Sequence, residues 1–103
     1  MREGEYQHSI ILKLEDMFPG CTVFKTDANY RQGFPDLVIL WHECWAALEV
    51  KTSPLASTQP NQDYYIKKLN DMSFAAYIYP EREEEVLSAL QQAFESPRGA
   101  RVS

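Results

Sequence analysis

Apolar residues recur at a spacing of three and four positions in three parts of the chain, and this spacing predicts three amphipathic helices. The first helix is expected over residues 3–18, where Pro19 and Gly20 end it. The second is expected over residues 60–72, and the third begins at Pro80. The buried stripes of the three helices are predicted to contain, in turn, Tyr6, Ile10, Leu14 and Met17; Tyr65, Leu69 and Met72; and Val86, Leu87, Leu90 and Phe94.

Between these helices lie four short apolar runs that are rich in β-forming residues. They predict strands over residues 21–25, 36–41, 44–51 and 74–79. The order is therefore helix, three strands, helix, strand, helix, which indicates an α/β fold with a mixed sheet of about four strands flanked by helices. We expect the first three strands to form a meander and the fourth to join the sheet through a helical crossover.

The length allows one small domain, which we expect to cover residues 1–95. Residues 96–103 are polar and contain Pro97 and Gly99, so a mobile tail is expected there. The sequence has no apolar run as long as a membrane span, and its first residues lack a signal-peptide pattern. These features predict a soluble protein without a membrane partner, located in the cytoplasm, or in the host cytoplasm if the source is viral.

The formal net charge of -5 argues against a simple nucleic-acid binder, which usually carries a basic surface. Residues 81–85 alone hold four acids against Arg82, and acids in a first helical turn complement the helix dipole. When this segment and the acids Glu5, Asp36 and Glu49 are set aside, nine bases and eight acids remain. The remaining surface is nearly neutral, which permits DNA binding without predicting it.

The candidate chemistry lies at one end of the hairpin predicted over residues 36–51. If two residues form its turn, Trp41 faces Cys44, and the same count places Asp36 opposite Glu49, with Cβ atoms roughly 5 Å apart. Glu49 and Lys51 are two positions apart, so their side chains project from the same face. This register therefore gathers two carboxylates and an ammonium group.

Two neighbouring carboxylates repel each other, and a divalent cation between them would remove that conflict. Mg²⁺ accepts one or two carboxylates together with water and phosphate oxygens. A lysine beside such a site can position a water molecule or stabilise negative charge on phosphorus. The alternative is an exposed hairpin end that carries an ordinary ion pair between Glu49 and Lys51.

These residues resemble the PD-(D/E)XK nuclease superfamily, and most closely its VRR-NUC branch of phage-type, junction-resolvase-like small nucleases. The resemblance runs from about residue 3 to residue 94. The pattern of the branch is an acid in the first helix, then Gly-x-Pro-Asp, Glu-x-Lys and a Gln that opens the next helix. In this chain the pattern falls on Glu5, Gly33–Asp36, Glu49–Lys51 and Gln62.

The resemblance implies a restriction-endonuclease-like core and metal-dependent hydrolysis of DNA phosphodiester bonds. Its metal ligands for Mg²⁺ or Mn²⁺ would be Glu5, Asp36, Glu49 and the carbonyl group of Val50. Glu3 is the rival of Glu5 as the helical ligand. An acid in a first helical turn is also favoured by the helix dipole without any catalytic role.

The remaining catalytic roles implied by the resemblance fall on Lys51, which would orient or activate the attacking water, and on Gln62, which would support it. A surface glutamine in a helix is the alternative interpretation for Gln62. In the polar loop over residues 26–32 and next to it, Lys25, Tyr30 and Arg31 are candidate contacts to DNA.

Small members of the family suggest a structure-selective endonuclease that acts on branched or four-way DNA as a homodimer. Two other classes stay open on the sequence alone. One is a non-catalytic module that binds DNA or another partner and retains the nuclease fold. The other is an acidic protein that mimics DNA or sequesters a basic partner.

Overall fold

The computed structural model describes residues 2–56 and 58–95, so the tail predicted over residues 96–103 lies outside the described part. The order of elements is the predicted one, α-β-β-β-α-β-α, and the α/β fold class is confirmed. The helices and strands are α1 (Glu3–Met17), β1 (Thr22–Lys25), β2 (Leu37–Trp41), β3 (Cys44–Val50), α2 (Pro60–Met72), β4 (Phe74–Ile78) and α3 (Glu83–Glu95).

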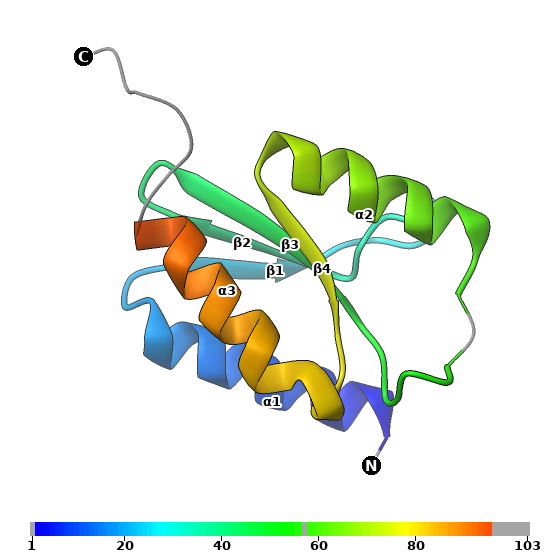
Figure 1. The fold of residues 1–103 in the computed structure, drawn as a ribbon, viewed down its shortest axis with the longest axis horizontal. Helices are drawn as coiled ribbons and strands as arrows, with labels where there is room; N and C mark the ends of the chain where they lie inside the picture. The colour runs from blue at the N-terminus through cyan, green and yellow to red at the C-terminus, as the bar shows by residue number, and fades with distance from the viewer. Residues whose placement is uncertain (1, 57, 96–103) are drawn as a thin grey trace.

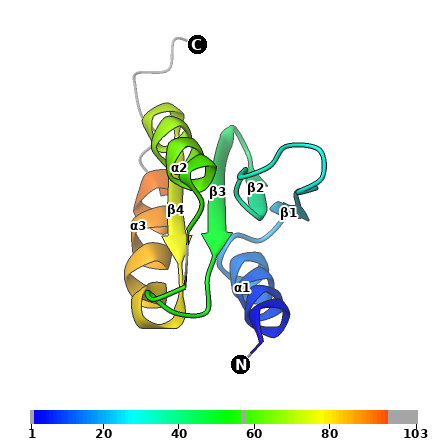
Figure 2. The same ribbon diagram turned by 90° about the vertical axis from the view of Figure 1, so that its right-hand side faces the viewer.

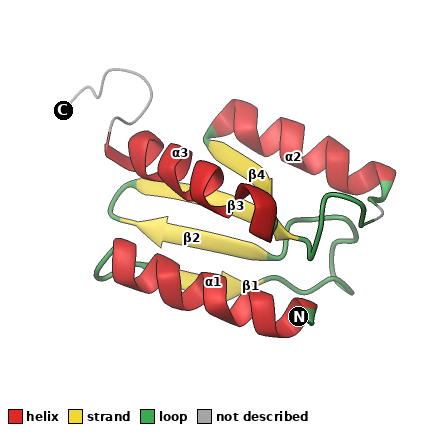
Figure 3. Cartoon of the chain, turned by 60° about the horizontal axis from the view of Figure 1, so that its bottom comes forward, coloured by secondary structure: helices red, strands yellow, loops and turns green. Residues whose placement is uncertain are grey.

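The four strands form one mixed sheet in the order β1-β2-β3-β4. The first three strands pair antiparallel as a meander, and β4 pairs parallel with β3 after the crossover through α2. Figure 3 shows this arrangement, with β3 and β4 pointing in the same direction. The predicted meander and helical crossover are therefore both confirmed.

The sheet separates two apolar layers. Helices α1 and α3 cover one face, where the larger core contains Leu37, Leu48 and Ile78 from the strands. Helix α2 covers the other face, where a smaller core is built around Ala47 and Leu69. Figure 1 shows α2 on the opposite side of the sheet from α1 and α3, and in Figure 2 it lies beside β4, at the other edge of the sheet from β1. The α2 face of β1 and β2 is consequently left partly open.

The prediction is wrong for one core residue. Met72 is 61% exposed, whereas the prediction placed it in the buried stripe of α2. The stripe instead runs through Ile66 and Leu69 to Ser73, whose hydroxyl donates a hydrogen bond to the Trp45 carbonyl group. At about 100° per residue, Met72 lies about 80° from the centre of that stripe, so its side chain reaches solvent.

The ends of the elements differ slightly from the predicted ones. The third helical segment opens with a 3₁₀ turn over Pro80–Arg82 before α3 begins at Glu83. The strand ladder between β2 and β3 stops at Leu37 and Leu48, so Asp36 lies just outside it. No helix among residues 2–56 and 58–95 combines the length and the apolar character that a bilayer crossing requires.

Gly33 joins the loop before β2 to the first turn of α2. Its φ angle is +87°, in the left-handed region that side chains disfavour. A Cβ atom added at this position would overlap Asn61, the neighbour of Gln62 in α2. Glycine is therefore required here both by conformation and by the close approach of two backbones.

Three Gly→Ala variants test this requirement by thermal or urea denaturation. Gly33→Ala is expected to lower the free energy of unfolding by about 2–3 kcal/mol, because strain and overlap act together. Gly20→Ala has the same φ of +87° but open space around it, and should cost about 1 kcal/mol. Gly4→Ala, in open space on α1, should stabilise by about 0.5–1 kcal/mol. Equal effects at positions 20 and 33 would contradict the packing argument.

Candidate active site

The hairpin has the predicted register. Trp41 pairs with Cys44 and Leu37 pairs with Leu48, so one further step brings Asp36 opposite Glu49. A two-residue turn makes this register possible, and within it His42 adopts a φ of 55°. The predicted juxtaposition of Asp36 with Glu49 follows from this pairing.

The carboxylate of Asp36 is fixed across the end of the hairpin. Its Oδ2 atom accepts a hydrogen bond from the backbone N–H of Val50 at 3.0 Å. Its own carbonyl oxygen accepts a hydrogen bond from the N–H of Thr26 at 2.9 Å, which ties the residue to β1. Asp36 therefore holds the end of β3 in place and leaves its second carboxylate oxygen for other partners.

Gln62 connects the other two predicted catalytic side chains. Its Nε2 group donates to Glu49 Oε2 at 2.9 Å, and its Oε1 atom accepts a hydrogen bond from Lys51 Nζ at 3.1 Å. The same Oε1 atom accepts the N–H of Gln59, as part of a capping box at the start of α2. The cap therefore fixes the amide orientation, and the amide in turn fixes Glu49 and Lys51.

Glu49 and Lys51 are buried, with exposures of 4% and 8%. Their Oε2 and Nζ atoms are 3.8 Å apart. Charged residues are seldom buried to this extent unless they are paired or bind an ion. Glu49 Oε1 is buried and accepts no hydrogen bond within the described chain, so one carboxylate oxygen is left without a partner.

The environment favours the protonated form of both acids. Burial and, to a smaller extent, the charge of Asp36 raise the pKa of Glu49 to about 7, although Lys51 opposes the rise. Burial also raises the pKa of Asp36 above its usual range, against the lowering effect of the Val50 N–H. A positive charge close to these oxygens would relieve the cost of ionising them.

The helical acid on the side of the site is Glu3 rather than Glu5. The charge of Glu3 contributes to the raised pKa of both Asp36 and Glu49. Helical geometry explains this, because Glu3 lies on the same side of α1 as the buried Tyr6, while Glu5 lies about 140° from the centre of the buried stripe. Of the two candidate helical acids, Glu3 therefore lies on the buried side of α1 and Glu5 does not.

The site offers few protein ligands, which suits a partly hydrated ion such as Mg²⁺ or Mn²⁺ better than a metal ion bound by protein ligands alone. Among the described residues, no three side chains of His, Cys, Asp or Glu gather closely enough to form a metal cluster. What remains is Asp36, Glu49 with its unpaired oxygen, and the carbonyl group of Val50. Mg²⁺ commonly takes only one or two carboxylates and keeps several waters, so these residues fit that ion.

Two residues beside the site were not predicted. Tyr77 of β4 pairs with Glu49 in the sheet, and its hydroxyl donates a hydrogen bond to Asp63, the neighbour of Gln62. The Nζ atom of Lys51 lies 6.0 Å from the Tyr77 ring centroid. Burial, together with Asp63, holds the pKa of Tyr77 well above its usual range, so Tyr77 stays a hydrogen-bond donor. A cavity of about 200 Å³, lined by Lys51 and Tyr77, opens at this point.

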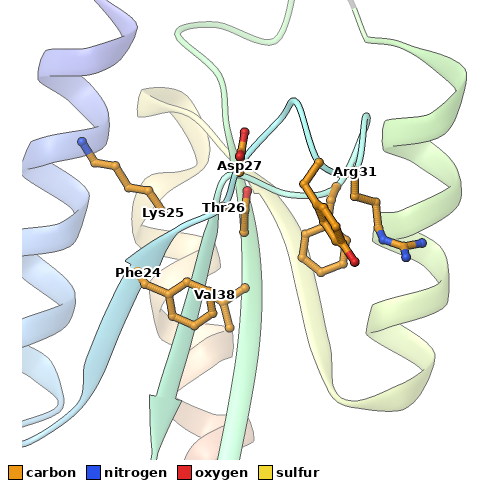
Figure 4. A pocket seen from close by; sticks show the side chains of 8 residues that line it. Phe24, Lys25, Thr26, Asp27, Arg31 and Val38 are labelled. Carbon is orange, nitrogen blue, oxygen red and sulfur yellow. The ribbon is translucent and has the colours of Figure 1, made fainter.

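The three predicted DNA contacts line one cavity, but their side chains do not form a single cluster. Tyr30 is 83% exposed, and its ring centroid lies 6.0 Å from the guanidinium carbon of Arg31. Lys25 borders the same region, but its side chain points away from Phe24 and Arg31, on the side of α1 (Figure 4). The loop therefore presents Tyr30 and Arg31 as a pair and Lys25 separately.

Comparisons of the chain with protein-family models, with curated proteins and with solved structures found no match. The resemblance to PD-(D/E)XK nucleases therefore rests on the quoted residues alone. The reaction and the substrate that it implies are proposals.

Proposed function

We propose that this chain is a divalent-metal-dependent endonuclease that hydrolyses DNA phosphodiester bonds. The observation that supports the proposal is the group that half-buried Asp36 forms with the buried Glu49 and Lys51 at one end of the hairpin. A hairpin end that served only structure would gain little from burying these charges, because desolvation offsets most of their attraction. A site that holds a cation and a polyanionic substrate, by contrast, requires such charged side chains.

In this proposal Asp36, Glu49 and the Val50 carbonyl group hold Mg²⁺ or Mn²⁺, and Glu3 replaces the predicted Glu5 as the acid contributed by α1. The bound ion would neutralise charge that develops on the phosphate and make its bound water more acidic. The unpaired Oε1 atom of Glu49 is the oxygen with the most to gain from such a partner.

The protein's own part of the chemistry falls on Lys51. Its ammonium group orients the attacking water and stabilises negative charge on the phosphate oxygens, and it does so in a buried setting where charges interact strongly. Gln62 holds Lys51 and Glu49 in a fixed relative position, so little reorganisation is needed when substrate binds.

Incision assays test the proposal directly. Purified protein is incubated with linear duplex, single-stranded, flapped and four-way DNA in Mg²⁺, in Mn²⁺ and in EDTA. Incision of at least one substrate is expected with metal and none with EDTA. No incision of any substrate with either metal would refute the proposal. The preference for branched DNA and the homodimer rest on chain size and resemblance, and the same substrates together with the oligomeric state in solution test them.

A matched pair of variants in this assay distinguishes the two helical acids. Glu3→Gln is expected to raise the metal concentration needed for half-maximal rate by about 10-fold, as for other groups that support a metal site. Glu5→Gln, on the far side of α1, should behave as the unaltered protein. The reverse ranking would restore Glu5 as the ligand.

A non-catalytic module that binds DNA or a partner is the second candidate. It is favoured by the absence of a three-residue metal cluster within the described residues. Calorimetric titration separates the two functions, because only the nuclease is expected to take up Mg²⁺ or Mn²⁺ in a manner that is lost in Asp36→Ala.

A further inference from the structure

A second, larger cavity lies on the open face of β1 and β2. Its volume is about 450 Å³, within the range of roughly 300–1,000 Å³ that is usual for small-molecule pockets. Phe24 and Val38 project side by side from neighbouring strands, and Arg31 lies across from them toward α2 (Figure 4). Tyr30 and Phe34 complete an aromatic wall, and the exposures of Phe24 and Tyr30 are 46% and 83%.

The charge at this cavity favours an anionic ligand. Arg31 donates a hydrogen bond to the Tyr65 hydroxyl at 3.1 Å and has no carboxylate partner within the described residues. Among the described residues that line the cavity, Asp27 is the only acid, and it accepts the N–H of Asn29 and so shapes its own loop. An arginine without an ion pair, held beside exposed aromatic rings, stands out in a chain of net charge -5.

The cavity is tied to the candidate active site by backbone contacts. Thr26, in the cavity wall, donates its N–H to the carbonyl of Asp36 and its hydroxyl to the carbonyl of Pro35. Phe34, also in the wall, comes two residues before Asp36. The tight packing of Gly33 on Asn61 fixes the same segment to the turn that carries Gln62.

We propose that this cavity binds one unpaired nucleobase, which stacks on Tyr30 and Phe24 while Arg31 contacts the adjoining phosphate. Every base offers a flat apolar face to an aromatic ring, whereas a base inside a duplex must first leave its stack at a cost of several kcal/mol. The substrate class is therefore DNA with a single-stranded segment next to the scissile bond. The position next to a scissile bond rests on the proposed function, whereas the base-binding site is testable without hydrolysis.

Fluorescence anisotropy in EDTA provides the test, with a short oligothymidylate, an abasic oligonucleotide of equal length and charge, and a duplex of that length. The oligothymidylate is expected to bind about 10-fold more tightly than either of the others, the usual scale for one stacked base. Tyr30→Ala should remove this difference by weakening oligothymidylate alone. Arg31→Ala should weaken the oligothymidylate and the abasic strand alike.

Tyr64→Ala is the matched control, because Tyr64 is also exposed, at 57%, but does not line the cavity. Equal affinity for oligothymidylate and the abasic strand, or unchanged binding by Tyr30→Ala, would overturn the inference. Base-dependent binding without any metal-dependent incision would leave the cavity assignment standing and refute only the nuclease. Incision that depends on Asp36, combined with equal binding of all three probes, would support the nuclease and refute only the base-binding site.

Discussion

Asp36→Asn and Lys51→Met are each expected to lower the rate of metal-dependent incision by about 10²–10⁴-fold while the protein remains folded. Asparagine retains an oxygen that can accept the Val50 N–H but lacks the charge that a cation requires. Methionine retains the buried stem of Lys51 but lacks the ammonium group. Initial rates on the best substrate of the incision assay give the effect, and circular dichroism melting verifies the fold.

The control for Lys51→Met is Lys67→Met, which removes an equal charge from the exposed side of α2. It should change the rate by less than about 3-fold at moderate salt, because exposed charges are screened. If Asp36→Asn or Lys51→Met cleaves at the rate of the unaltered protein, the assignment of the catalytic site is wrong. A similar loss in Lys67→Met would indicate a general charge effect on DNA binding.

The second large effect is expected in stability. Without metal, the free energy of unfolding should fall by about 2–3 kcal/mol between about pH 5 and about pH 8, which corresponds to a drop in Tm of about 10–20 °C. The folded pKa of Glu49, about 7, lies above the usual 4.5, so the folded chain binds this proton more tightly than the unfolded chain. The resulting stabilisation is complete below pH 4.5 and is lost as the pH rises through about 7.

Thermal melts in EDTA and in Mg²⁺ measure this effect. Mg²⁺ should raise Tm more at about pH 8 than at about pH 5, because the ion binds the ionised carboxylates that high pH produces. Glu49→Gln should flatten the profile in EDTA, whereas Glu15→Gln, an exposed acid of α1, should leave it unchanged. Parallel profiles for Glu49→Gln and the unaltered protein would show that another group dominates.

The hairpin and its register could be predicted because the sequence constrains them strongly. Two apolar runs separated by two residues allow few pairings, and a slip by one residue would turn the apolar side chains of β2 and β3 out of the core. Once Trp41 faces Cys44, the approach of Asp36 to Glu49 follows by counting. The placement of Gln62 in a first helical turn followed from Pro60 alone.

Other parts of the site depend on contacts that local patterns do not contain. The pairing of Tyr77 with Glu49 depends on the register of β4 against β3, and a connection through a helix does not fix that register. The aromatic cavity depends on the path of the loop before β2, which the packing of Gly33 on Asn61 determines. The position of Glu3 on the buried side of α1, by contrast, was available from the sequence, because a helical projection places Glu3 with Tyr6 and Ile10.

The parallel pairing of β3 with β4 has a consequence for how the chain assembles its candidate active site. The meander of β1, β2 and β3 closes through short connections, whereas β4 reaches β3 only after the long excursion through α2. Loop-closure entropy makes such distant pairings late events in folding. Asp36 and Glu49 should thus come together early, and Lys51 should acquire its amide partner only when the crossover docks, so a partly folded chain would have the acids without the lysine in its working position.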